Sequence, residues 1–288
     1  MPVQYPFSPR NVKVAGQYCL SCIDEGQGRT VVLLHGNPSW SYLYRNMVAD
    51  LRKNCRCIAP DHIGCGFSDK PQNYPYRLAN HIDNLDNLLD ELQVEKCVLV
   101  MHDWGGSIGM GWAVRHPERV EKLVVMNTAA FRSTRIPLRI AVCRWPLIGP
   151  LLVRGFNVFA GAAIHMAVAG KMDREVAAGF LLPYNSWANR IAILRFVQDI
   201  PLHKNHPSWQ DLLTIEKGLK SLSKKPMLVC WGGRDFCFTE HFYNEWRQRF
   251  PEAKCHYFPN AGHYLLEDAY EDVFPLVRHF IFSGSRER

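Results

Sequence analysis

The stretch that decides the fold is VLVMHDWGG, residues 98–106. Its aliphatic run predicts a buried strand, and Gly105 and Gly106 permit a tight turn into the helical pattern that follows. A sharp strand-to-helix turn of this kind pushes its central side chain out at the end of the strand. That side chain is Asp103. The alternative is that Asp103 only caps the following helix.

Short aliphatic runs alternate with helical patterns on both sides of this turn. This alternation predicts an α/β fold, a mostly parallel sheet flanked by helices, with ligands bound at the carboxyl ends of the strands. The expected strands are 31–34, 57–60, 97–101, 123–126, 227–230 and 255–258, and the expected helices are 41–52, 78–92, 105–116, 241–250 and 272–282.

A long helical segment without aliphatic strand runs interrupts this alternation. We predict a core formed by residues 1–128 and 223–288, with a helical cap at 129–222. The apolar face of the cap is expected to wall a pocket, although it could instead pack into a small core of its own. The candidate lining residues are Leu151, Leu152, Val153, Phe156, Val158, Phe159, Ile164, Met166 and Val168.

Composition excludes several classes of protein. The 288 residues are 47% hydrophobic and 21% charged, which is typical of a folded domain rather than a disordered or fibrous chain. The net charge is +7, but there is no run of five like charges and no zinc-finger spacing, so nucleic acid is not an expected partner. No P-loop and no GxGxxG after a strand is present, so no cofactor is expected.

The ten cysteines are scattered, and no secretory signal opens the chain. We therefore expect reduced thiols and a cytoplasmic location. Cys19 and Cys22 form a CxxC pair, and Cys55 and Cys57 form a CxC pair. Neither pair has a second ligand pair at a zinc-like distance, so no metal site is expected.

Residues 136–170 form the most apolar long stretch, but arginines, prolines and a histidine interrupt it, so it is not expected to span a bilayer. The cap also carries a row of arginines. These could meet an acidic partner or a membrane surface, or form a solvated face. They are Arg132, Arg135, Arg139, Arg144 and Arg154.

A carboxylate at the exposed turn restricts the chemistry. Attack by Asp103 on an acyl carbon would give an unstable anhydride, whereas attack on an sp³ carbon gives an alkyl ester that an activated water can cleave. The expected electrophile is therefore a saturated carbon that bears a leaving group.

Two further side chains follow the last two predicted strands. His263, in NAGHY at 260–264, is the candidate base. Asp235, in WGGRD at 231–235, is placed to accept the other ring N–H and to stabilise the imidazolium, or it is a plain turn residue. Asp103, Asp235 and His263 are all expected at one edge of the sheet.

A leaving anion needs hydrogen-bond donors near Asp103. Asn37, in HGNP at 35–38, follows a strand and can aim its side-chain amide and backbone N–H at the site. Trp104 contributes a backbone N–H and an indole N–H. The alternatives are an asparagine that serves only its turn and a tryptophan that serves only the core.

Three runs of sequence now resemble a known family. HGNPSWSYLYRN at 35–46, DHIGCGFSDKP at 61–71 and HDWGG at 102–106 resemble the haloalkane dehalogenases of the α/β-hydrolase superfamily, and the resemblance extends from about Val31 to the C-terminus. It implies an α/β-hydrolase fold with a helical cap inserted after the sixth strand. It also implies a nucleophile, acid and base at Asp103, Asp235 and His263, and leaving-group donors at Asn37 and Trp104.

Many members of that family carry their acid after the sixth strand, where this chain has Asn127, which cannot serve. The pattern therefore resembles the third dehalogenase subfamily, which includes the β-lactone decarboxylases of bacterial long-chain olefin biosynthesis. NTAAFRS at 127–133 and YNSWANR at 184–190 are similar to those decarboxylases.

The leading hypothesis is decarboxylation of a long-chain dialkyl β-lactone (an oxetan-2-one) to a cis-alkene and CO₂, and haloalkane dehalogenation is the alternative. Epoxide hydrolysis would need cap tyrosines to protonate the ring oxygen, and Tyr184 is one candidate. A non-catalytic binding module is the remaining alternative. The expected partners are a hydrophobic small molecule, a multi-enzyme assembly or a second copy through the cap, and the surface of a membrane.

Overall fold

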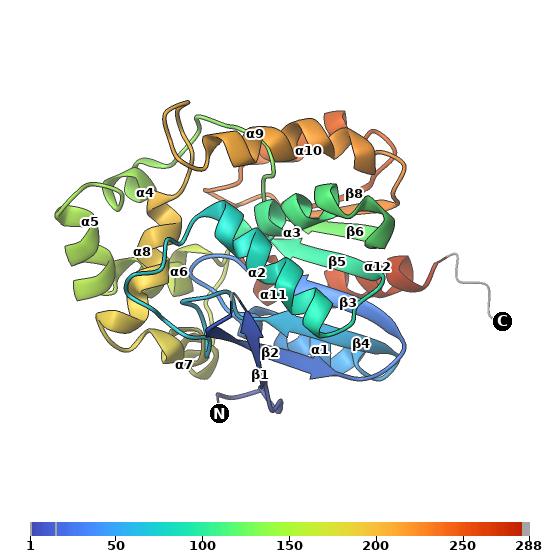
Figure 1. Ribbon diagram of the computed structural model, residues 1–288, viewed down its shortest axis with the longest axis horizontal. Coiled ribbons are helices and arrows are strands. Elements are labelled where there is room, and N and C mark those ends of the chain that lie inside the picture. The colour runs from blue at the N-terminus through green and yellow to red at the C-terminus, as the bar shows by residue number, and fades with distance from the viewer. Residues whose placement is uncertain (1, 15, 284–288) are drawn as a thin grey trace.

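The computed structural model describes residues 2–14 and 16–283. Its eight-stranded sheet has the order β1-β2-β4-β3-β5-β6-β7-β8 (Figure 1). β1 pairs antiparallel with β2 and β2 pairs antiparallel with β4, while every other pair is parallel, as predicted. The strands are β1 (Arg10–Val14), β2 (Tyr18–Glu25), β3 (Arg29–Leu34), β4 (Cys55–Pro60), β5 (Cys97–His102), β6 (Val120–Met126), β7 (Met227–Gly232) and β8 (Lys254–Phe258).

Two strands were not predicted. β1 and β2 form an antiparallel hairpin at one edge of the sheet. β1 exposes alternate residues of RNVKV, so it lacks the continuous aliphatic run that identifies the central strands. Cys19 and Cys22 lie within β2, and all ten cysteines are free thiols.

Helices cover both faces of the sheet and bury a separate apolar cluster on each face. Alternate residues of one strand enter opposite clusters: Val32 and Leu34 pack with one, Val31 and Leu33 with the other. The first cluster involves α2 (Leu78–Glu91), α3 (Trp104–Arg115) and α10 (Glu240–Arg249), and the second involves α1 (Arg45–Leu51), α11 (Leu265–Asp268) and α12 (Tyr270–Phe282).

The segment between β6 and β7 is helical. Most of it lies at one end of the molecule, at the left of Figure 1, while α9 returns beside α10. Its helices are α4 (Leu138–Val142), α5 (Ile148–Pro150), the π-helix η3 (Leu151–Gly155), α6 (Val158–Met166), α7 (Arg174–Leu181), α8 (Ile191–Gln198) and α9 (Trp209–Gly218). Short 3₁₀ turns η1 (Ser41–Tyr44), η2 (Pro117–Arg119), η4 (Leu182–Tyr184), η5 (Ala188–Arg190) and η6 (Leu219–Leu222) complete the chain.

Within the described ranges, no single helix has the length and apolar character needed to cross a membrane. One bent pair, Ile148–Gly155 with Val158–Met166, meets the length and composition requirement when its two parts are taken together, with a bend of 66° between them.

Candidate active site

Asp103 occupies the turn between β5 and α3. Its backbone has φ 50° and ψ −126°, in the left-handed half of conformational space that side-chain-bearing residues rarely adopt. Thr128 Oγ1 donates to the Asp103 carbonyl and lies against Gly106, where any side chain would collide with it. Asp103 stands at the N-cap position of α3, but its carboxylate makes no capping hydrogen bond. The turn therefore leaves the carboxylate free for another role.

The Asp103 carboxylate is buried, with 6% of the residue exposed, and it lines a cavity. Burial raises its pKa, and the charge of His263 and the N–H groups of Asn37 and Trp104 act in the opposite direction. The Asn37 backbone N–H donates to Oδ1 at 2.6 Å. A side chain at Gly36 would occupy the space of this carboxylate. The result is a poorly solvated carboxylate held in one orientation.

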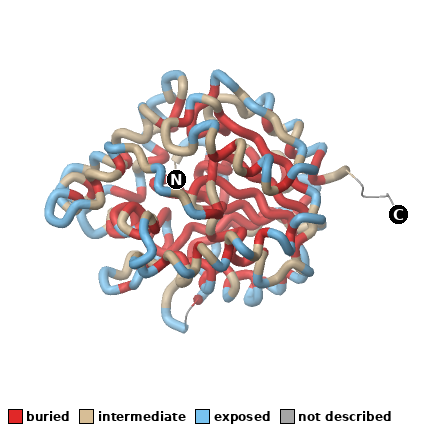
Figure 2. Tube along the Cα trace, turned by 90° about the horizontal axis from the view of Figure 1, so that it is seen from above, coloured by how far each residue is buried: buried red, intermediate tan, exposed pale blue. Residues whose placement is uncertain are grey.

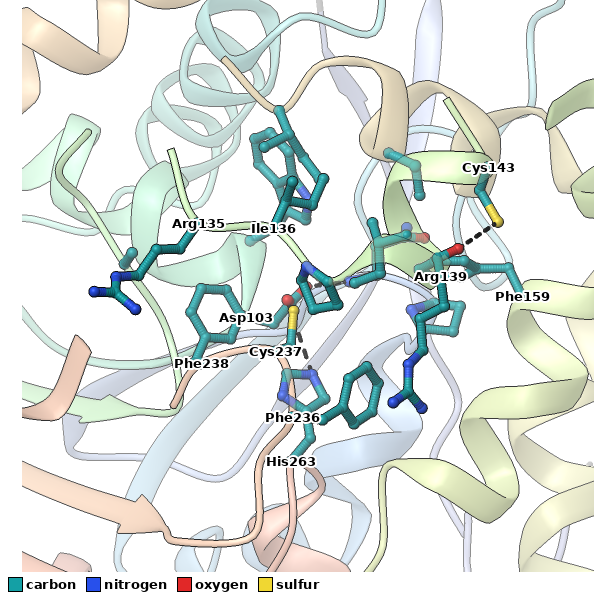
Figure 3. A pocket seen from close by; sticks show the side chains of 18 of the residues that line it. Asp103, Arg135, Ile136, Arg139, Cys143, Phe159, Phe236, Cys237, Phe238 and His263 are labelled. Carbon is teal, nitrogen blue, oxygen red and sulfur yellow. Dashed lines mark hydrogen bonds and ion pairs between the residues drawn. The ribbon is translucent and has the colours of Figure 1, made fainter. Parts of the chain in front are cut away.

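His263 and Asp235 complete the predicted constellation. His263 Nδ1–H donates to Asp235 Oδ2 at 2.7 Å, and Nε2 lies 3.8 Å from Asp103 Oδ2. Figure 3 shows Asp103 and His263 facing each other at the cavity. The loops after β5, β7 and β8 thus bring residues 103, 235 and 263 to one edge of the sheet.

The charges of Asp235 and His263 stabilise each other. Burial alone would raise the pKa of Asp235, but His263 and the backbone N–H groups of Cys237 and Phe238 lower it overall. Burial alone would lower the pKa of His263, but Asp235, and to a smaller extent Asp103, raise it overall. An imidazolium at His263 is therefore favoured between the two carboxylates.

Asn127 supports Asp235, a role that the sequence analysis did not identify. Its Nδ2 donates to Asp235 Oδ2 and to the Gly232 carbonyl, both at 3.0 Å, and its Oδ1 accepts from Gly232 N–H at 2.8 Å. The residue is fully buried at the end of β6. Its place directly after a central strand, beside the predicted acid-bearing loop, is the feature from which this role could have been inferred.

His102 is a second unpredicted support. Its Nε2–H donates to the His263 carbonyl at 2.8 Å, and the two rings lie 4.5 Å apart. Burial lowers the pKa of His102 to about 3, so its ring is neutral and adds no positive charge beside His263.

The two predicted donors also line the cavity. One Asn37 Nδ2 hydrogen is used by the Ile193 carbonyl at 3.1 Å, and the amide has a second hydrogen to offer. The Asn37 backbone N–H binds Asp103 rather than pointing into open space. The Trp104 ring packs 5.2 Å from Phe196, and its indole N–H makes no hydrogen bond within the described ranges.

The cavity has a volume of about 320 Å³ and mostly apolar walls. The polar side chains that line it, besides the constellation at its base, are Ser107, Ser133, Arg135 and Arg139. Of the nine predicted cap residues, Val158, Phe159 and Met166 line it. The prediction was wrong for the others, because the helices of the cap are short and turn many apolar side chains away from the cavity. Leu151 and Phe156, for example, are 54% and 69% exposed. The remaining apolar walls come chiefly from Ile136, Ile140, Ala162, Ala163, Val197, Ile200, Phe236 and Phe238.

Tyr184 does not face this cavity. It is fully buried and its hydroxyl donates to the Ser39 carbonyl at 2.9 Å. No tyrosine is among the cavity-lining residues of the described chain. In the same described part, no group of three or more His, Cys, Asp or Glu side chains is placed to hold a metal ion.

Comparison with known proteins identifies the family of this chain. The family model for the alpha/beta hydrolase fold matches residues 29–270. The chain belongs to the α/β-hydrolase family. A Shewanella oneidensis protein named cis-3-alkyl-4-alkyloxetan-2-one decarboxylase is 49% identical over 269 residues, which cover 91% of this chain and 85% of that protein. A Xanthomonas campestris protein of the same name is 41% identical over 290 residues, covering 96% and 97%.

The crystal structure of a haloalkane dehalogenase from Bradyrhizobium elkani is similar to this chain, with a TM-score of 0.88 and 26% identity, covering 96% of this chain and 97% of that one. The predicted α/β-hydrolase fold is therefore confirmed, and so is the predicted relationship to both the decarboxylases and the dehalogenases.

Proposed function

We propose that this α/β-hydrolase decarboxylates cis-3,4-dialkyl β-lactones to cis-alkenes and CO₂. The observation that carries the proposal is a buried carboxylate, Asp103, that faces an apolar cavity and has hydrogen-bond donors beside it. The names of the 49% and 41% identical relatives supply the substrate class.

In the first step, Asp103 attacks the ring carbon that bears the lactone oxygen. The carbon–oxygen bond of the ring breaks, and its electron pair becomes the charge of a carboxylate on the neighbouring carbon. In this proposal Asn37 and Trp104, which both line the cavity, donate hydrogen bonds to that developing anion. The intermediate is an alkyl ester of Asp103 that carries a β-carboxylate.

In the second step, the bond between that carboxylate and its carbon breaks and releases CO₂. The electron pair forms the alkene, and the ester bond to Asp103 breaks so that its carboxylate is restored. The apolar walls favour this step, because they solvate the intermediate's carboxylate poorly. No water is consumed, and no external redox partner is needed.

This sequence accounts for the product geometry. Attack by Asp103 inverts the ring carbon, so the ester oxygen and the carboxylate can leave from opposite sides of the new double bond. Two alkyl groups that are cis on the lactone are then cis on the alkene.

His263 and Asp235 act on charge and position. The His263 imidazolium, 3.8 Å from Asp103, stabilises the carboxylate that is restored in the second step. Asp235 holds the ring through Nδ1 and keeps its pKa raised. Asn127 orients Asp235 and is a positioning residue.

Haloalkane dehalogenation is the second candidate, and the similarity to a solved dehalogenase favours it. The same carboxylate would displace halide, Asn37 and Trp104 would bind it, and neutral His263 would activate the water that cleaves the ester. Epoxide hydrolysis has less support because Tyr184 faces away from the cavity. A non-catalytic binding role does not explain why His263 lies between the carboxylates of Asp103 and Asp235.

Paired substrate assays separate the two candidates. The purified protein is incubated with a synthetic cis-dialkyl β-lactone, and separately with 1-bromobutane or 1,2-dibromoethane. We expect cis-alkene from the lactone, with none formed by the Asp103→Ala variant. Rapid bromide release with an unconsumed lactone would assign the protein to the dehalogenases.

The remaining parts of the proposal concern the setting of the enzyme. A cytoplasmic location is supported by ten cysteines that are all free thiols. A hydrophobic small-molecule ligand is supported by the apolar cavity. Assembly with other enzymes or a second copy through the cap stays a prediction.

A further inference from the structure

Large apolar side chains are exposed on the surface of the cap around α4, α5 and η3. Leu147 is 87% exposed and Leu138 is 78% exposed. Each exposed leucine forfeits the stabilisation that burial would give, and a group of such side chains on one surface marks a site of interaction. The other exposed members are Trp145, Ile148, Leu151, Phe156, Val158 and Trp187. We call these eight residues the cap apolar surface.

This surface lies at the end of the molecule farthest from the described C-terminal end. Figure 1 shows α4 and α5 at the left extremity, and Figure 2 shows the chain at that end mostly as exposed or intermediate. The backbone of Leu147 has φ 66°, an unfavourable conformation for leucine, in the loop that joins α4 to α5. The loop thus holds the exposed Leu147 side chain in a backbone conformation that is unfavourable in free energy.

The same segment is strongly basic. Residues 129–172 contain five arginines and one lysine and no aspartate or glutamate. Arg132 pairs with Glu216, but Arg135, Arg139, Arg144 and Arg154 make no ion pair within the described ranges. No carboxylate of the described residues is therefore in direct contact with these four guanidinium groups.

The arginines and aromatic rings are interleaved. The Arg154 guanidinium lies 4.6 Å from the centre of the exposed Trp187 ring, and the Arg139 guanidinium lies 4.6 Å from that of Phe236. Exposed tryptophans, aliphatic side chains and arginines together are the combination found where proteins enter the interface of an anionic bilayer. The bent pair Ile148–Gly155 and Val158–Met166 is also as apolar as a membrane-embedded segment.

The cap apolar surface adjoins the entrance of the cavity. Val158 belongs to this surface and also lines the cavity. The exposed basic residues Arg135 and Arg139 line the cavity too. Leu138 stands on α4 between two cavity-lining neighbours, Pro137 and Arg139. The cavity mouth therefore opens within the same apolar and basic region.

We propose that the cap apolar surface docks on an anionic lipid bilayer and places the cavity mouth at the membrane. Leucine and tryptophan side chains enter the interface, and the unpaired arginines contact lipid phosphates. A further consequence, which rests on the proposed function, is that a long alkene passes directly between the cavity and the hydrocarbon core without crossing water. The docking itself does not depend on the reaction.

Vesicle co-sedimentation tests the docking without any substrate. The full chain is mixed with vesicles of phosphatidylcholine alone, or of phosphatidylcholine with phosphatidylglycerol. We expect binding to the anionic vesicles that decreases as salt is added, because salt screens the arginine–phosphate attraction. The double variant Leu138→Asp/Leu147→Asp is expected to bind at least ~10-fold more weakly.

The control is Val3→Asp, which puts one aspartate, half the added charge of the double variant, on an exposed aliphatic residue outside the cap and is expected to bind as the wild type does. Thermal unfolding checks that every variant is folded. Neither Leu138 nor Leu147 lines the cavity, so lactone turnover in detergent should be unchanged in the double variant. Failure of the docking proposal, seen in the vesicle assay, is thus distinguishable from failure of the proposed function, seen in the turnover assay.

Three results would overturn the proposal: equal binding to neutral and anionic vesicles, undiminished binding of the double variant, or a wild-type protein that ignores both vesicles. If the wild type ignores vesicles but self-associates, and the double variant is monomeric by analytical ultracentrifugation, the surface belongs to a second copy of the chain instead.

Discussion

Replacing Asp235 by asparagine isolates the contribution of its charge, because the amide has nearly the same shape. The carboxylate accepts four hydrogen bonds: Oδ1 from the N–H groups of Cys237 and Phe238, at 2.6 and 3.1 Å, and Oδ2 from His263 and Asn127, at 2.7 and 3.0 Å. An amide has only one acceptor oxygen. Whichever way the new side chain turns, its NH₂ group faces two donors.

The least costly arrangement keeps the amide oxygen on the two backbone N–H groups. The NH₂ group then faces His263, which must move its proton to Nε2, and it faces the Asn127 amide, which loses a partner. One buried donor left without a partner costs about 1–3 kcal/mol of unfolding free energy, so Tm should fall by several degrees. The pKa of His263 should fall, because the charge that raises it is gone.

The two candidate reactions should respond differently. Hydrolysis of an alkyl ester requires His263 as a base with its proton on Nδ1, so bromide release in steady state should fall by ~10³–10⁴-fold. Lactone decarboxylation requires only the positive charge near Asp103, so cis-alkene formation should fall by ~10–100-fold.

The assay compares wild type and Asp235→Asn by gas chromatography of the alkene, by bromide release and by thermal unfolding. Asp272→Asn, which makes the same chemical change on an exposed residue of α12, is the matched control and should match the wild type. An unchanged Tm together with rates within ~3-fold of the wild type would refute the assigned role of Asp235.

Three more predictions follow from the same geometry. Burial raises the pKa of Asp103, so kcat/KM for the lactone should decline as the pH falls, beginning above the ordinary carboxyl pKa of ~4. A pH profile that stays flat down to pH ~4 would contradict this. Gly36→Ala should destabilise the protein by ~1–3 kcal/mol and abolish turnover, because the added methyl group occupies the position of the Asp103 carboxylate. Thermal unfolding and alkene assays test this, and near-normal turnover would be inconsistent with it. Ala163→Phe, on a cavity-lining turn of α6, should lower kcat/KM for long-chain lactones by ~10-fold or more and leave kcat/KM for short-chain lactones unchanged. Gly161→Ala on the same helix, where the added methyl group meets open space, should change neither value. Equal losses on both chain lengths would argue against a steric effect.

The central part of the fold could be predicted from sequence because its elements are locally distinctive. The aliphatic runs that became β3, β5 and β7 are buried on both faces, so they contain no polar alternation that would obscure them. The edge strand β1 exposes alternate polar residues, and only its pairing with β2 defines it as a strand.

The site also has residues that could be predicted from the sequence and residues that could not. Asp103, Asp235 and His263 each follow a predicted strand, and parallel strands end at one edge, so their meeting could be inferred. Asn127 and His102 act through contacts between loops that are distant in sequence, which no local pattern reveals. The cap was predicted least well, because short helices joined by irregular turns give no steady periodicity from which to assign a buried face.

Mass spectrometry of the His263→Ala variant after exposure to 1-bromobutane tests most directly whether Asp103 attacks saturated carbon. Without a base to activate water, the alkyl ester should persist, and peptide mapping should place one butyl group on Asp103 and none on the cavity-lining thiols of Cys143 and Cys237. Once bromide release shows that the wild type accepts 1-bromobutane, a folded variant whose Asp103 stays unmodified, or whose butyl group is on a cysteine, would contradict the proposed nucleophile.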